Sequence, residues 1–267
     1  MNDRAKELSR DALLQLFTDY VGPEYVQSVR NEVRSGRHGG FLFPARTLLI
    51  LFASRSGSNF LAQLLCSTGW FAEINESFRP SQLKKIAERH GLPDCHAAAQ
   101  WMIDRRGTAH AFGLKAGFAT LIAAAELGAL SELLETGHVV LLRRRDRLGQ
   151  AISLVRSRLA GRTHSGQQER REVTDADYDR EAIAFQLDLI GEREQQFEDM
   201  AKRFGKDASV VHYEDVCSDP QRHVAAICES MGLPFPENYV PEVRVQILRD
   251  DLSERWAKRF RSEPREA

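Results

Sequence analysis

The sequence contains no run of about 18 apolar residues, which is the length that a helix needs to cross a bilayer. It also lacks a surplus of one charge, because 37 Lys and Arg residues oppose 38 Asp and Glu residues for a net charge of −1. A basic surplus is typical of nucleic-acid-binding domains, so no nucleic-acid partner is expected. The first residues lack the apolar core of a signal peptide, which favours a cytoplasmic protein without a membrane span.

Cysteine is scarce and scattered. The four cysteines form no C-x-x-C pair and no spacing that suits a metal ion: Cys66, Cys95, Cys217 and Cys228. Cys66 and Cys228 fall in apolar helical patterns, so buried free thiols are expected and a metal site is not. A hydrophobic fraction of 42% over 267 residues is that of a globular protein with a substantial core.

Apolar strand-like segments alternate with longer helical patterns after residue 45. Strands are expected at residues 46–53, 111–115, 138–143 and 209–213. Helices are expected at residues 61–68, 80–90, 94–106, 121–135, 146–159, 175–204, 220–231 and 252–261. Strands separated by helices of about ten or more residues imply βαβ units. The pattern therefore predicts an α/β fold of three layers, with a central parallel sheet flanked by helices on both faces.

The first part of the chain has a different character. Residues 3–35 contain two amphipathic helical patterns that are separated by Gly22 and Pro23. A polar, glycine-rich stretch follows at residues 35–40. We expect an N-terminal helical arm over residues 1–44, packed on the main domain or on a partner, and one domain over residues 45–267.

The strand expected at residues 46–53 runs directly into a Ser/Gly turn, S-R-S-G-S-N at residues 54–59, and then into a helix. This geometry directs backbone N–H groups and the positive end of a helix dipole at one point, which makes an anion site. The turn is shorter than the G-x-x-x-x-G-K-[ST] loop of nucleotide triphosphatases. Asn59 stands where a Mg²⁺-binding hydroxyl would be, so a phosphate or sulfate bound without a metal is expected.

A second polar cluster, R-R-R-D-R at residues 143–147, follows another expected strand. Arginines at the end of a buried strand are costly unless an anion meets at least one of them. Ser153 lies about two helical turns further on and can turn its hydroxyl toward the same place. A solvated arginine cluster is the alternative, although the positive end of a helix dipole disfavours it. Two anion sites at neighbouring strand ends suit a nucleotide with phosphates at its 5′ and 3′ ends.

Both polar segments resemble the nucleotide motifs of sulfotransferases that use 3′-phosphoadenylyl sulfate (PAPS), and the chain is similar to the Stf0 (trehalose 2-sulfotransferase-like) family. The resemblance spans residues 46–262 and rests on residues 53–60, 68–70, 75–78, 113–115, 143–153, 213–215 and 252–256. It implies a P-loop-like sulfotransferase domain that moves a sulfuryl group from PAPS to a hydroxyl of a carbohydrate or glycolipid-like acceptor. It also implies a homodimer and a reaction without a metal.

The resemblance assigns roles to individual residues. It implies a 5′-phosphosulfate site formed by Arg55, Ser56, Gly57, Ser58 and Asn59. Arg144, with Arg145 as the neighbouring candidate, and Ser153 would bind the 3′-phosphate. Glu76 matches the general base that is proposed for the family, and Arg55 would stabilise charge on the transferring group. The C-terminal Trp256 and Arg259 are weaker candidates for closing over the nucleotide.

Several alternatives stay open at this point. Glu76 can be an ordinary solvated loop acid, with His90 or His110 as rival bases. Lys115 either touches the phosphate loop or the substrate, or lies on the surface as an ordinary lysine. The polar segment 161–171 is the expected lid on the acceptor side. A P-loop small-molecule kinase that uses ATP, and a non-catalytic nucleotide-binding protein, are the alternative functions.

Overall fold

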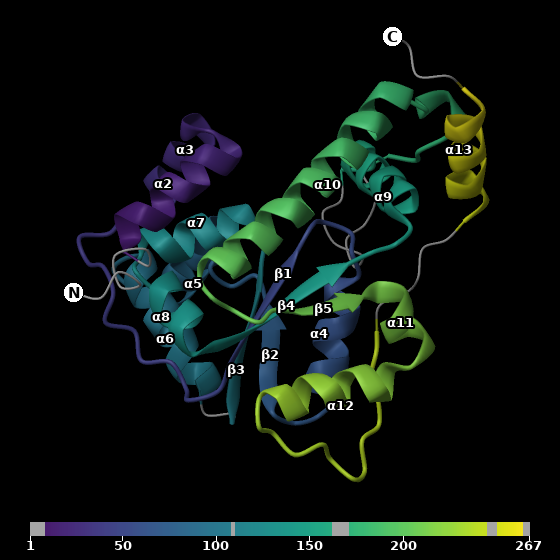
Figure 1. The fold of residues 1–267 in the computed structure, drawn as a ribbon. Helices are drawn as coiled ribbons and strands as arrows, with labels where there is room; N and C mark the ends of the chain where they lie inside the picture. Colours follow the sequence, from purple (N-terminus) through teal and green to yellow (C-terminus); the bar gives the residue numbers. More distant parts are fainter. Residues whose placement is uncertain (1–8, 108–109, 162–170, 245–249, 264–267) are drawn as a thin grey trace.

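A five-stranded parallel sheet forms the centre of the computed structural model, which describes residues 9–107, 110–161, 171–244 and 250–263 (Figure 1). The strands are β1 (Thr47–Phe52), β2 (Phe71–Asn75), β3 (Ala111–Ala116), β4 (Gly137–Arg143) and β5 (Ser209–His212). Their order is β2-β3-β1-β4-β5, and every neighbouring pair is parallel. The carboxyl ends of all these strands therefore meet at one edge of the sheet, with the end of β1 in the middle.

Helices cover both faces of the sheet (Figure 1). One face carries α5 (Pro80–His90), α6 (Cys95–Gly107), α7 (Phe118–Glu126) and α8 (Leu130–Thr136), and the other carries α4 (Ser58–Cys66) and α12 (Pro220–Ser230). Successive side chains of a strand point to opposite faces. Leu49 and Leu51 accordingly belong to the first buried cluster, whereas Leu48 and Ile50 belong to the second. The expected three-layer α/β fold is confirmed.

A third buried cluster lies beside the carboxyl edge of the sheet. It joins α9 (Arg147–Leu159), α10 (Arg180–Arg203) and α13 (Asp251–Ser262). Two short helices, η1 (Asp175–Asp177) and α11 (Tyr213–Ser218), precede α10 and follow β5, respectively. Trp256 of α13 is 1% exposed within this cluster, together with Ala53 at the end of β1 and Ile152 of α9. The last helix is thereby part of the core that supports the end of β1. In the described part of the chain, no helix has both the length and the apolar character needed to cross a bilayer.

The N-terminal arm packs on the main body of this chain. It consists of α2 (Arg10–Val21) and α3 (Pro23–Val33), whose apolar faces share a buried cluster with α7. Arg10 and Arg30 both form ion pairs of 2.7 Å with Glu126 at the end of α7, and the Glu126 side chain is 4% exposed. The buried Glu126 carboxylate thus forms ion pairs with both helices of the arm.

Glu126→Gln is expected to lower the free energy of unfolding by about 1–3 kcal/mol, because one neutral amide cannot replace a carboxylate that two guanidinium groups share. Denaturant unfolding monitored by circular dichroism measures the change. Asp11→Asn is the matched control, since Asp11 pairs with the same Arg10 but its side chain is 88% exposed, and a change below about 0.5 kcal/mol is expected there. Equal losses in the two variants would contradict the role given to Glu126.

Parts of the predicted element pattern were wrong. β2 was not expected, because its burial alternates irregularly and its pairing with β3 shifts register between Phe71 and Ile74. The single helix expected at residues 121–135 is two helices, α7 and α8, and the chain turns between them at Gly128. The single helix expected at residues 175–204 is the short helix η1 followed by α10, and α11 was not expected. The other expected strands and helices are present within the described residues, with differences of a few residues at their ends.

Candidate functional site

The turn between β1 and α4 is a preformed anion cradle. Arg55 has a left-handed φ of 68°, and Gly57, the residue that caps α4, has a left-handed φ of 88°. The Ser56 side chain is fully buried, and its hydroxyl has no hydrogen-bond partner among the described residues. A buried hydroxyl without a partner is costly. Together with the N-terminus of α4, this hydroxyl suits an anionic oxygen of a phosphate or sulfate.

The cradle is held from two sides by residues distant in the sequence. Gln150 of α9 is buried, and its amide nitrogen donates to the backbone carbonyls of Ser54 at 2.9 Å and Ala53 at 3.4 Å. On the other side the Tyr213 ring packs on Gly57 so closely that a Cβ there would lie 2.1 Å from Tyr213 Cδ2. The close approach requires glycine at position 57. The positioning role of Gln150 was not predicted, although Gln150 lies within the second motif.

The structure brings the two expected anion motifs together. Arg55 Nε donates a hydrogen bond of 3.0 Å to Ser153 Oγ, and these residues are 98 positions apart in the sequence. Because α9 begins beside the end of β4 and β4 pairs with β1, Ser153 reaches back over the loop. The residues assigned to the two anion sites are therefore in direct contact.

Most of the arginine cluster is already paired with acids. Arg143 and Arg147 form ion pairs with Glu198 and Glu194 of α10, at 2.7 and 2.5 Å. Both terminal nitrogens of Arg145 donate hydrogen bonds to the Asp215 carboxylate, at 2.5 and 2.7 Å, and the Arg145 side chain is 52% exposed. This hydrogen-bonded pair lowers the pKa of Asp215.

Arg144 is turned inward and is less fully paired. Its side chain is 14% exposed, its guanidinium lies 5.6 Å from the Tyr213 ring centre, and one terminal nitrogen lies 3.1 Å from Asp146. Its Nε is buried without a hydrogen-bond partner in the described residues, with a Glu214 oxygen 4.0 Å away. Arg144 therefore keeps a donor for a further anion, next to the loop that Tyr213 also touches.

Glu214 fixes the backbone of this turn. Its carboxylate accepts from the backbone N–H groups of Arg145 at 3.0 Å and Asp146 at 3.2 Å. Burial alone would raise the pKa of Glu214, but these N–H groups lower it. The segment 213–215 thus contacts both anion motifs. Its Tyr213 ring packs on the phosphate loop, and the carboxylates of Glu214 and Asp215 bind the turn at residues 143–147.

Glu76 follows β2 directly and is half-buried. The residues on either side of it are held by Arg106 of α6, which donates to Asn75 at 3.0 Å and Ser77 at 2.7 Å. Arg106 also pairs with Glu73 at 2.6 Å. Burial lowers the pKa of Arg106, and Glu73 offsets part of that effect. The backbone that carries Glu76 is therefore anchored, although its catalytic role stays a prediction.

Lys115 of β3 lies at the phosphate loop and is not a surface residue. It is 3% exposed, and its ammonium lies 3.5 Å from Ser58 Oγ and within hydrogen-bond distance of Asn59 Oδ1. Burial lowers the pKa of Lys115, and the charge of Glu76 acts in the opposite direction. Of the alternatives left open by the sequence, contact with the loop is the one that the structure supports.

The remaining candidates lie elsewhere or are engaged otherwise. Trp256 is a core residue, so its indole is not available to close over a nucleotide. Arg259 pairs with Glu263 at 2.7 Å and lies 4.0 Å from the Tyr178 ring centre. The rival bases pack on tryptophans, His90 on Trp101 and His110 on Trp70. Residues 162–170, most of the expected lid, lie outside the described residues.

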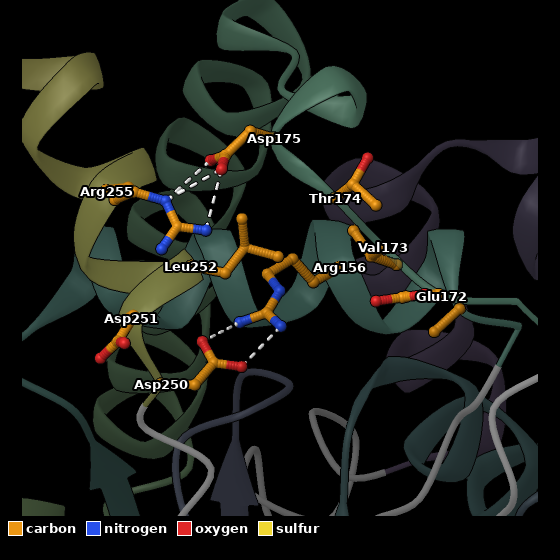
Figure 2. Close-up of a pocket in the computed structure, with 10 residues that line it drawn as sticks. Arg156, Glu172, Val173, Thr174, Asp175, Asp250, Asp251, Leu252 and Arg255 are labelled. Carbon is orange, nitrogen blue, oxygen red and sulfur yellow. Dashed lines mark hydrogen bonds and ion pairs between the residues drawn. The ribbon is translucent and has the colours of Figure 1, made fainter.

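A pocket of about 590 Å³ opens between the end of α9, residues 172–175 and the start of α13 (Figure 2). Two ion pairs frame it, Arg156 with Asp250 and Arg255 with Asp175, at 2.6 and 2.8 Å. None of its lining residues belongs to the candidate anion site. The pocket and the anion site are therefore separate features, and α9 contributes residues to both.

Comparison with known proteins identifies the family of the second half of the chain. The Stf0 sulphotransferase family model matches residues 124–263, which is more than half of the 267 residues. A solved structure, the sulfotransferase domain from the Synechococcus PCC 7002 olefin synthase, is 15% identical with a TM-score of 0.47, covering 88% of this chain and 94% of that chain. No curated protein matches. The family match includes Arg144 and Ser153, whereas the phosphate loop and Glu76 precede it.

Proposed function

Because the chain belongs to the Stf0 sulphotransferase family, we propose that it moves the sulfuryl group of PAPS to a hydroxyl of a carbohydrate or glycolipid-like acceptor. Family membership makes the chain a sulfotransferase in general. The donor, the class of acceptor and the residues that act are the parts proposed here.

One contact carries the proposal, namely the hydrogen bond from Arg55 to Ser153. It places the loop with the buried Ser56 hydroxyl beside the turn that carries Arg144. A ligand held by both elements needs two separate anionic groups on one small molecule. A nucleotide with a 5′-phosphosulfate and a 3′-phosphate has them, which supports PAPS as the donor.

The proposed reaction is an in-line transfer between two oxygens. The bond from sulfur to the bridging phosphate oxygen breaks with its electron pair, and the bond from the acceptor oxygen to sulfur forms. Glu76 takes the proton that the acceptor hydroxyl loses. Arg55 and the N–H groups at the start of α4 stabilise the charge that collects on the leaving phosphate. The product nucleotide is adenosine 3′,5′-bisphosphate.

The kinase alternative is disfavoured by the surroundings of Asn59. A P-loop kinase needs a hydroxyl at this place to bind Mg²⁺. Here the Asn59 side-chain oxygen accepts from the Lys115 ammonium, and a fixed cation repels a divalent metal ion from the same point.

Calorimetric titration tests the donor. PAPS, adenosine 3′,5′-bisphosphate and ATP are each titrated into the protein with and without Mg²⁺, and PAPS and the bisphosphate are expected to bind more tightly than ATP, without dependence on Mg²⁺. Tighter binding of ATP with Mg²⁺ would overturn the proposal in favour of a kinase. Incubation with radiolabelled PAPS and a panel of sugars and glycolipids then identifies the acceptor. If the protein binds the nucleotide but forms no labelled product, the non-catalytic alternative is favoured.

Arg144→Ala is expected to weaken binding of adenosine 3′,5′-bisphosphate by about 10- to 100-fold, because a charge-assisted hydrogen bond to the 3′-phosphate is lost. Arg145→Ala is the matched control, because the Arg145 guanidinium already donates to both oxygens of Asp215. A loss of affinity below about threefold is expected for this variant. Calorimetry with the bisphosphate and with adenosine 5′-phosphate separates the 3′-phosphate contact from other effects. The reverse ranking would assign the 3′-phosphate to Arg145.

The proposal treats residues 45–267 as the sulfotransferase domain and residues 1–44 as a helical extension. The homodimer implied by the family resemblance and the cytoplasmic location expected from the sequence stay predictions. Sedimentation analysis of the purified protein tests the first.

A further inference from the structure

We infer that Lys115 of β3, oriented by Asn59, is a second cation that binds the sulfonate of the donor. The order of the strands in the sheet matches the order of the reacting groups along the bound acceptor and donor. This inference rests on the proposed function. It concerns a residue that the functional roles above do not use.

The burial of Lys115 is the first step. A lysine that is 3% exposed is costly unless its charge is compensated. Among the described residues, the oxygens within reach of its ammonium, on Ser58 and Asn59, belong to neutral side chains. The Phe52 ring centre lies 5.5 Å away, and Glu76 is the acid whose charge acts on Lys115. Two neutral oxygens, one ring and one acid at longer range compensate a buried ammonium only in part. An anion at this point would complete the compensation.

The loop carries one cation, Arg55, but no lysine after its last glycine. In the nucleotide triphosphatase loop a lysine directly follows the last glycine and reaches the terminal phosphates. In this chain Ser58 follows Gly57, so no lysine stands there. Lys115 brings an ammonium to the same turn from the neighbouring strand, because β3 pairs with β1 in parallel and the two strands end side by side.

The sheet order then gives the position of Lys115 along the bound donor. From one edge, β2 carries Glu76, β3 carries Lys115, β1 carries the phosphate loop and β4 carries Arg144. Neighbouring strands lie about 4.8 Å apart. Acceptor hydroxyl, sulfonate, 5′-phosphate and 3′-phosphate follow the same order in the proposed complex. Lys115 thus stands at the sulfonate, between the proton acceptor and the leaving phosphate.

Lys115 stays protonated through the transfer. The sulfur–oxygen bond to the 5′-phosphate breaks with its electrons going to the phosphate, the acceptor oxygen bonds to sulfur, and Glu76 takes the acceptor proton. The ammonium of Lys115 offsets the negative charge on the transferring sulfonate oxygens during this step.

The test compares two ligands that differ only in the sulfonate. Lys115→Met keeps the length of the side chain and removes the charge. Calorimetry is expected to show PAPS binding weakened about 10- to 100-fold, while binding of adenosine 3′,5′-bisphosphate changes by less than about threefold. Lys84→Met is the matched control, because Lys84 lies on α5 in an exposed pair with Glu32, and neither affinity is expected to change.

Each other result has a separate meaning. Equal losses for both ligands would place Lys115 at the 5′-phosphate and overturn the inference, and so would no loss for either. A wild-type protein that binds neither ligand would instead overturn the proposed function. Lys115→Met is expected to melt no lower than the wild type, since a buried ammonium is exchanged for an apolar group of similar volume. Lys115→Gln gives the same comparison if the Met variant fails to fold.

Discussion

Gly57→Ala is expected to abolish useful nucleotide binding, with a loss of roughly 100-fold or more in affinity for adenosine 3′,5′-bisphosphate. Two costs add at this position. The backbone has a left-handed φ of 88°, and a methyl group would lie 2.1 Å from Tyr213 Cδ2. The loop and the Tyr213 ring cannot both keep their places. Calorimetry with the bisphosphate measures the loss, and thermal unfolding measures the accompanying destabilisation of about 2–5 kcal/mol.

Gly69→Ala separates the two costs. Gly69 has a similar φ of 78°, but a methyl group there would meet no atom within 4 Å. We expect this control to lose about 1–2 kcal/mol of stability and none of the nucleotide affinity. The double variant Gly57→Ala, Tyr213→Ala should be less destabilised than the sum of the single variants, because the ring that causes the clash is gone. Strict additivity would mean that the Tyr213 contact is not the cause.

Glu76→Gln is expected to lower kcat by about 100- to 10,000-fold with little change in nucleotide affinity, because the amide cannot take the proton of the acceptor hydroxyl. Gln keeps the shape of the side chain, and Arg106 holds the flanking Asn75 and Ser77. The site should therefore keep its geometry. Initial rates with saturating PAPS, on the acceptor found with the radiolabelled panel, give kcat and KM for comparison.

Glu88→Gln is the control for this measurement, since Glu88 is an exposed acid on α5 outside the site. Its rates should equal those of the wild type. Undiminished transfer by Glu76→Gln would remove Glu76 as the base and return attention to the rival histidines. A parallel fall in nucleotide affinity would indicate that Glu76 organises the loop instead of taking the proton.

Local patterns were enough to predict most of the fold. Residues 48–52 are all apolar and lead into a Ser/Gly turn, so the burial of β1 and its exit into a helix follow from composition. β2 carries no comparable signal, because Phe71 and Ile74 are buried while the two residues between them are exposed. An edge strand with a shifted register depends on its neighbour for its conformation, and the sequence of one strand does not contain that neighbour.

The candidate site divides in the same way. The loop and the arginine turn were predicted because each is a continuous motif beside a strand. The contacts that hold them, Tyr213 on Gly57 and Gln150 on the loop carbonyls, come from packing between distant segments. Trp256 could have been placed correctly, since Leu252, Trp256 and Phe260 recur every four residues as on the buried face of a helix.

The position of Trp256 also bears on the order in which this protein becomes functional during synthesis. Ala53, at the entrance to the phosphate loop, and Trp256 belong to the same buried cluster, and Trp256 leaves the ribosome well after Ala53. Chains emerge amino end first, and domains fold as units. A nascent chain that still lacks α13 has an incomplete buried cluster beneath its phosphate loop, so nucleotide binding is delayed until α13 has emerged. Ribosome-bound chains arrested before and after α13 would acquire nucleotide binding only at the later point.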